Sequence, residues 1–151
     1  MTCAYIGLGA NLGDPVASLR GAIVEISQLP STRLLQTSRF FRTKPVDAQG
    51  ADYVNAVVSI DTTLAAHELL AALQRLEQQA GRERPYRNAP RTLDLDVLIY
   101  GDNHITTADL TLPHPRMFQR AFVLVPLAEI APHLVNALQL AAVADQQVCP
   151  I

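Results

Sequence analysis

Residues 91–100 read Arg-Thr-Leu-Asp-Leu-Asp-Val-Leu-Ile-Tyr, and the turn-forming run Gly-Asp-Asn follows at 101–103. Apolar side chains alternate with polar ones here, which predicts a β-strand with one buried face. Because successive side chains of a strand point to opposite faces, Asp94 and Asp96 share one face with Thr92. The leucines between them point the other way, towards a core.

Two carboxylates at such positions lie roughly 7 Å apart at their Cα atoms. Like charges beside a core cost free energy unless something positive compensates them. Mg²⁺ is one candidate, because it takes oxygen ligands from one or two carboxylates and shares them with substrate phosphates. The alternative is a half-exposed strand with two solvated acids, and Asp94 and Asp96 alone do not decide between the two.

The composition fits one globular domain, since 49% of the 151 residues are hydrophobic and 17% are charged. The net charge of -2 supplies no field that would attract nucleic acid, so we expect no nucleic-acid partner. We see neither a signal peptide nor an apolar run that could span a bilayer, so we expect a cytoplasmic protein with no membrane partner. Cys3 and Cys149 are too few for a disulfide framework.

Arginine dominates the cations: 12 residues are lysine or arginine, and Lys44 is the only lysine. The guanidinium fork suits phosphate oxygens. A polar, proline-interrupted loop before the acidic strand carries four of them, Arg82, Arg84, Arg87 and Arg91. Alone, this charge run would be a solvated surface. Next to two carboxylates that can hold Mg²⁺, it provides the parts that phosphoryl transfer needs.

Apolar periodicity and turn residues predict the other elements. In chain order we expect a strand at 3–8, a glycine-rich loop at 7–13, a helix from Asp14-Pro15, strands at 32–41 and 53–60, a helix at about 65–80, a hairpin turn at Gly101 with a return strand at 104–105, and a helix from Pro115. The glycines favour a turn into a helix over a dinucleotide-binding loop, because the third is misplaced for that motif. We leave the order of the alanine-rich tail from about residue 134 open.

Two polar residues stand out from these elements. Asn55 lies among apolar strand residues, and if buried it needs hydrogen-bond partners from either a ligand or a neighbouring loop. His114 lies between two prolines, and a helix from the second proline would place Arg116 and Arg120 one turn apart. That arrangement is suited to binding a phosphate, although a lone histidine is more often structural.

Several runs of the chain resemble the 6-hydroxymethyl-7,8-dihydropterin pyrophosphokinase family of the folate pathway. The most specific are Pro-Arg-Thr-Leu-Asp-Leu-Asp at 90–96 and Pro-His-Pro-Arg-Met at 113–117. Weaker runs are Gly9-x-Asn11-Leu12-Gly13, Thr43-x-Pro45-Val46, Asp52-Tyr53-x-Asn55-Ala56 and Glu77-x-x-x-Gly81-Arg82-x-Arg84. The resemblance extends from residue 4 to about residue 132.

The resemblance implies an α+β fold of ferredoxin-like type, with an antiparallel sheet covered by helices, in a single pyrophosphokinase domain over 1–151. It implies transfer of the β,γ-diphosphate of ATP to the hydroxymethyl group of the pterin, with release of AMP. It further implies ATP as co-substrate, two Mg²⁺ ions, small-molecule partners only, and a monomer.

The resemblance also implies roles for individual residues. By this resemblance, Asp94 and Asp96 bind the metal, and together with Arg82 and Arg91 they form the catalytic group. ATP contacts fall to Gln74, Glu77, Arg84, Arg91, Val97, His114, Arg116 and Arg120. The pterin pocket falls to Thr43, Val46, Tyr53, Asn55 and Phe122. For Gln74 and Glu77, which lie three apart on one side of a helix, a solvated face is the alternative reading.

The chain departs from the family pattern in two loops. Some members carry Trp-Gly where this chain has Asn88-Ala89, and Lys44 and Asp47 replace commoner small residues. Three rival functions remain: another Mg²⁺-dependent transferase on the same carboxylates, an RNA-binding module, and a pterin-binding member without turnover. The acidic net charge and the lack of aromatic RNA-binding runs speak against the RNA-binding module.

Overall fold

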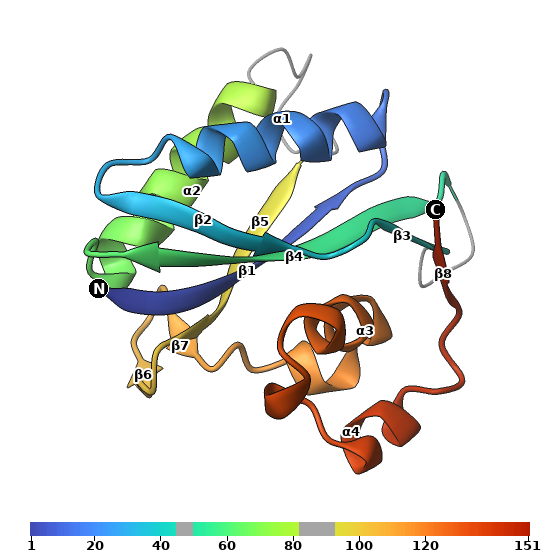
Figure 1. The fold of residues 1–151 in the computed structure, drawn as a ribbon. Helices are drawn as coiled ribbons and strands as arrows, with labels where there is room; N and C mark the ends of the chain where they lie inside the picture. The colour runs from blue at the N-terminus through green and yellow to red at the C-terminus, as the bar shows by residue number, and fades with distance from the viewer. Residues whose placement is uncertain (45–49, 82–92) are drawn as a thin grey trace.

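A computed structural model describes residues 1–44, 50–81 and 93–151 of the chain (Figure 1). In these residues the strands are β1 (Thr2–Ala10), β2 (Thr32–Thr37), β3 (Phe41–Thr43), β4 (Tyr53–Thr62), β5 (Asp94–Tyr100), β6 (Ile105–Thr106), β7 (Thr111–Leu112) and β8 (Val148–Pro150). The α-helices are α1 (Pro15–Ser27), α2 (Ala66–Gly81), α3 (Ala121–Ile130) and α4 (Ala137–Ala142). Short 3₁₀ turns lie at Met117–Gln119 and Pro132–Leu134.

The main sheet is antiparallel and has β1 and β4 at its centre. Its strand order is β5-β1-β4-β3-β8, and β2 pairs with the other half of the β4 edge that β3 occupies. Helix α1 connects β1 to β2, and α2 connects β4 to β5, so the two crossovers give the ferredoxin-like arrangement. The predicted α+β class, with an antiparallel sheet covered by helices, is confirmed.

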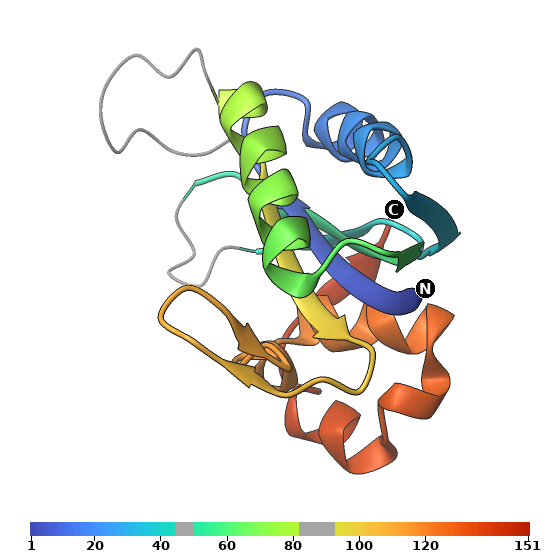
Figure 2. The same cartoon turned by 90° about the vertical axis from the view of Figure 1, so that its left-hand side faces the viewer.

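The sheet separates two hydrophobic cores. Helices α1 and α2 cover one face, α3 lies against the other, and α4 packs on α3 on the side away from the sheet (Figures 1 and 2). On β1, Ile6 and Leu8 join the first core, whereas Tyr5 joins the second. On β4 the same alternation sends Val58 to the first core and Val57 to the second, as the sequence predicts.

Helix α1 begins where the sequence places it. Asp14 is the N-cap, and its carboxylate accepts a hydrogen bond from Ala17 N–H at 3.1 Å. Pro15 takes the first helical position, where no backbone donor is needed.

None of the helices within 1–44, 50–81 and 93–151 is long and apolar enough to cross a membrane.

Strand β1 is longer than predicted. It runs to Ala10, so Gly7 and Gly9 lie inside a strand that is paired on both sides, and not in a loop. The prediction of a loop at 7–13 was wrong for its first half, because ladders from β4 and β5 override the weak strand propensity of glycine.

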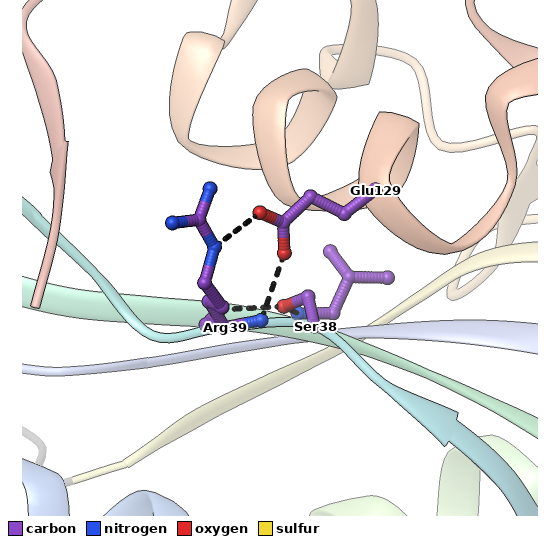
Figure 3. A network of polar contacts seen from close by, with 4 residues as sticks. Ser38, Arg39 and Glu129 are labelled. Carbon is purple, nitrogen blue, oxygen red and sulfur yellow. Dashed lines mark hydrogen bonds and ion pairs between the residues drawn. The ribbon is translucent and has the colours of Figure 1, made fainter.

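The predicted strand 32–41 is broken at Ser38. Backbone N–H of Ser38 donates to Val57 O at 2.9 Å, and the Ser38 hydroxyl accepts from Val57 N–H at 3.0 Å, in place of a backbone carbonyl. The next residue, Arg39, turns outward and binds Glu129 of α3 through both its backbone N–H (2.9 Å) and its Nε (2.6 Å), as Figure 3 shows. The break therefore joins the sheet edge to α3.

Two further segments differ from the sequence prediction, and a third answers a question that the sequence left open. The return strand at Ile105–Thr106 pairs with Thr111–Leu112 and not with β5. Gly101 turns at φ +54°, and its N–H donates to Cys3 O of β1. The helix expected from Pro115 is a 3₁₀ turn at Met117–Gln119, and α3 begins only at Ala121. The tail is ordered, since β8 adds to the sheet beside β3.

We expect Ser38→Ala to lower the free energy of unfolding by about 1–3 kcal/mol, because it leaves the fully buried Val57 N–H without an acceptor. Urea denaturation would measure the change. Ser18→Ala within α1 is the control, with an expected change under about 0.5 kcal/mol. Equal stability of Ser38→Ala and the wild-type chain would contradict this account of the strand break.

Candidate active site

A cavity of about 1110 Å³ opens beside the start of α3, on the sheet face opposite α1 and α2. Strands β1, β3, β4 and β5 line it, together with Glu77 of α2, the segment between β7 and α3, the first turn of α3, and the residues just before and at the start of β8. The same sheet face carries the second core further along, so one face serves both as packing surface and as cavity floor.

Glycines make the floor of this cavity. Gly7 and Gly9 occupy the positions of β1 whose side chains would point into it, so bare backbone lines the cavity there. A Cβ atom on Gly9 would lie 2.8 Å from Nδ2 of Asn55, closer than real Cβ contacts come. A side chain at residue 9 is therefore incompatible with the present position of the Asn55 amide.

The two aspartates of β5 form one wall. Asp94 pairs with Gly9 and Asp96 with Gly7, so both project on the cavity side of the sheet. Between them, Leu95 N–H donates to Oε2 of Glu77 at 2.8 Å, which fixes a third carboxylate from α2 beside the strand. Negative charge is thus concentrated at the beginning of β5.

This donor set fits Mg²⁺. Carboxylate oxygens are the ligands that the ion prefers, and it keeps water or substrate phosphates in its remaining positions. Within residues 1–44, 50–81 and 93–151, no group of three or more histidine, cysteine, aspartate or glutamate side chains could hold a metal alone. A metal at Asp94 and Asp96 would therefore depend on water and substrate oxygens for the rest of its shell.

Basic residues of the segment before α3 line the same cavity as the aspartates. His114, Arg116 and Arg120 line the cavity and flank or precede the 3₁₀ turn. The backbone N–H of His114 donates a hydrogen bond to Leu98 O at 2.8 Å, which attaches this segment to β5. The predicted single helix is absent, but the turn still brings both arginines to the cavity.

The surroundings of His114 favour its neutral form. Burial lowers its pKa below the usual value, the charges of Arg120 and Arg116 lower it further, and Asp96 opposes them. Its Nδ1 accepts a hydrogen bond from Arg116 N–H at 3.2 Å, which leaves the proton of the neutral ring on Nε2. The imidazole can therefore donate one hydrogen bond without adding charge.

Another part of the lining, here named the uncharged end, consists of uncharged and aromatic side chains, with Lys44 and Arg120 next to it. The Thr43 hydroxyl donates to Oδ1 of Asn55 at 2.9 Å, and both side chains are buried. Tyr53 and Phe122 supply rings, and the guanidinium of Arg120 lies 5.4 Å from the centroid of Phe122. This combination of fixed amide and rings suits a planar heterocycle with polar edges.

The predicted site residues divide into three groups. The cavity brings together Thr43, Tyr53, Asn55, Glu77, Asp94, Asp96, His114, Arg116, Arg120 and Phe122. Gln74 is exposed on α2 and Val97 packs in the first core, so neither side chain lies on the described cavity wall. Val46, Arg82, Arg84, Arg91, and with them Asp47 and the 88–89 pair, lie outside the described residues, and their roles stay predictions.

Sequence reasoning missed other cavity residues. Gly7 and Gly9 are two apart in a strand, a spacing that signals a bare strand face once β1 is recognised as central. Gln119, Gln146 and Val148 also line the cavity, and no motif marks them. The last two lie in the tail whose order the sequence left open.

The fold and this charged cavity define a class, an α+β enzyme of ferredoxin-like topology. Residues 5–132 match the family model described as 7,8-dihydro-6-hydroxymethylpterin-pyrophosphokinase (HPPK). The chain belongs to this family, and it is accordingly an enzyme of the pyrophosphokinase type.

Curated relatives agree with that assignment. The 2-amino-4-hydroxy-6-hydroxymethyldihydropteridine pyrophosphokinase of Haemophilus influenzae is 51% identical over 136 residues, which cover 89% of this chain and 85% of the relative. The enzyme of the same name from Methylorubrum extorquens is 46% identical, over 89% of this chain and 86% of the relative.

Solved structures agree in fold. The wild-type HPPK-DHPS of Plasmodium falciparum with SDX-DHP matches at a TM-score of 0.70 and 11% identity. The match covers 95% of this chain but 43% of that chain, so the present chain spans less than half of the fused protein.

We expect His114 to titrate below the usual histidine value of about 6.5, as followed by NMR of the imidazole. Arg120→Gln should raise the pKa and Asp96→Asn should lower it, because each removes one of the named charges. The folded chain binds this proton less well than the unfolded chain, so stability falls as pH drops through about 6.5. Shifts of the opposite sign in the two variants would contradict the assigned surroundings.

Proposed function

We propose that this chain transfers the β,γ-diphosphate of ATP to 6-hydroxymethyl-7,8-dihydropterin in folate biosynthesis, with Mg²⁺ and release of AMP. The observation that carries the proposal is that Asp94 and Asp96 line one cavity together with Arg116 and Arg120, in a chain of this family. The relatives named above carry the enzyme name of this reaction.

The chemistry needs positioning and charge neutralisation. The hydroxymethyl oxygen attacks the β-phosphorus of ATP. The bond between the β-phosphorus and the α,β-bridging oxygen breaks, and AMP leaves with that oxygen. When bound at Asp94 and Asp96, two Mg²⁺ ions supply charge neutralisation at the phosphate oxygens. The guanidinium groups of Arg116 and Arg120 stabilise the same oxygens, and His114 donates a hydrogen bond there.

We assign proton removal to the carboxylates of β5. The attacking alcohol loses one proton as the new O–P bond forms, and Asp96 is the more exposed of the two β5 carboxylates. We assign to it the acceptance of that proton, directly or through water. At the uncharged end, Asn55 hydrogen-bonds the edge of the pterin, and Tyr53 with Phe122 packs against its faces.

Product analysis tests the proposal. Purified chain with ATP, Mg²⁺ and 6-hydroxymethyl-7,8-dihydropterin should form AMP only when the pterin is present, as measured by ion-exchange chromatography. We expect Asp94→Ala and Asp96→Asn to lose at least about a hundredfold in rate. Asp102→Asn, in the exposed turn after β5, is the matched control and should keep the wild-type rate.

Each other product would point to a different function. ADP in place of AMP would mean transfer of a single phosphoryl group, and the proposal would be wrong. Bound pterin with ATP left intact would mean a binding protein without turnover. Full activity of Asp96→Asn would remove that residue from proton transfer.

Gly9→Ala tests the floor of the cavity. The new methyl group would push the Asn55 amide aside, so we expect the KM for the pterin to rise about tenfold while the KM for ATP changes less than about twofold. Gly21→Ala is the matched control, because nothing lies within 4 Å of the added atom, and it should stabilise α1 by about 0.4–1 kcal/mol. Equal pterin KM values for Gly9→Ala and wild type would refute the close approach.

A further inference from the structure

The last residues of the chain form part of the cavity wall. Gln146, Gln147 and Val148 line it, although the family model matches residues 5–132 only. The site therefore contains a segment that the family match does not include, and its contacts show what this segment does.

The side chain of Gln146 hydrogen-bonds the backbone on both sides of Arg120. Its Oε1 accepts a hydrogen bond from Ala121 N–H at 2.9 Å, and its Nε2 donates to Gln119 O at 2.9 Å. Arg120 is the N-cap residue of α3 and makes no side-chain capping bond there. The side chain of Gln146 thus supplies the capping acceptor from 25 residues further along the chain.

The segment is anchored at both of its ends. Val143 is buried in the second core, and Val148 begins β8, where it pairs with Thr43. The N–H of Ile151 donates to Phe40 O at 3.0 Å beyond that pairing. Residues 146–148 therefore bridge two walls of the cavity, one at the start of α3 and one at Thr43.

Each of those walls carries a residue of the uncharged end of the cavity, next to Arg120 on one wall and Lys44 on the other. Phe122 is the second residue of α3, directly after the Ala121 N–H that Gln146 caps. Thr43, on the other wall, fixes the Asn55 amide. Any loosening of Gln146 would allow the start of α3, and the Phe122 ring with it, to move relative to that amide.

We propose that Gln146 is a positioning residue for the heterocycle, and that it sets the distance between the Phe122 ring and the Thr43–Asn55 pair. This inference rests on the proposed function, which supplies the pterin as the ligand. A stacked ring needs a fixed partner, whereas the long side chain of Arg120 can still reach a phosphate after a small shift of α3. Loss of Gln146 therefore weakens pterin binding more than nucleotide binding.

The test compares binding of two ligands by the full chain. Isothermal titration would give the Kd for 6-hydroxymethyl-7,8-dihydropterin in the presence of α,β-methylene-ATP and Mg²⁺, and the Kd for α,β-methylene-ATP alone with Mg²⁺. Gln146→Leu removes both hydrogen bonds at similar volume. Gln146→Glu keeps the acceptor for Ala121 N–H but places an oxygen against Gln119 O.

We expect the pterin Kd to rise about fivefold in Gln146→Leu and less in Gln146→Glu, while the nucleotide Kd stays within about twofold of wild type. Gln36→Leu, the same change at an exposed position of β2, is the control and should leave both Kd values unchanged. Thermal unfolding of each variant shows that the folded state is being titrated.

Two results would overturn the inference. An unchanged pterin Kd in a folded Gln146 variant, whatever its melting temperature, would make the residue merely structural. An equal rise in both Kd values would mean general loosening of the cavity. Should Gln146→Leu fail to fold, Gln146→Glu decides. A wild-type chain that binds no pterin would instead refute the proposed function, which keeps the two failures distinguishable.

Discussion

Strand β1 lies between β4 and β5, and at Gly7 and Gly9 it carries no side chain on the face opposite α1 and α2. That missing volume is what leaves room for a cavity on a sheet of small size. With ordinary side chains at these positions, the face would close over as a continuous core, and at residue 9 a methyl group would already collide with Asn55. The strand tolerates two glycines because it is paired along both edges, so ladder hydrogen bonds replace what side-chain packing would otherwise contribute.

On the strands beside β1, the side chains change from core residues to cavity-lining residues at the level of the two glycines. On β4 the cavity-side sequence passes from Val57 in the second core to Asn55 in the cavity, and on β5 it passes from Leu98 to Asp96. Antiparallel register is the reason, because Gly7 pairs with both Val57 and Asp96, so a transition on one strand is level with the transitions beside it. A slip by one residue would turn the aspartates into the core beneath α2. The register that buries the apolar face therefore also builds the site.

Local patterns predicted the parts of the structure that depend on local rules. Alternation in β5 placed Asp94 and Asp96 on one face, and the capping chemistry of Asp14 placed the start of α1. Parts that depend on distant contacts could not be read in this way. The Ser38 break needs the backbone of Val57, and the start of α3 needs the amide of Gln146. The tail lacks periodicity because β8 is short and is stabilised by pairing with β3 and not by its own composition.

Charges of both signs line the cavity, and this limits the ligand it can take. A free triphosphate would be repelled by Glu77 and the two aspartates of β5, and a free divalent cation would be repelled by Arg116 and Arg120. A triphosphate that carries its metal satisfies both sets of charges at once, since the cation meets the carboxylates and the phosphate oxygens meet the arginines. His114 lines the same cavity, and because its pKa is lowered, its neutral form can contribute a hydrogen bond without adding charge. The uncharged end at Asn55 and Phe122 is then free to select the acceptor by shape and hydrogen bonding, which is the discrimination that a transferase with a common phosphate donor requires.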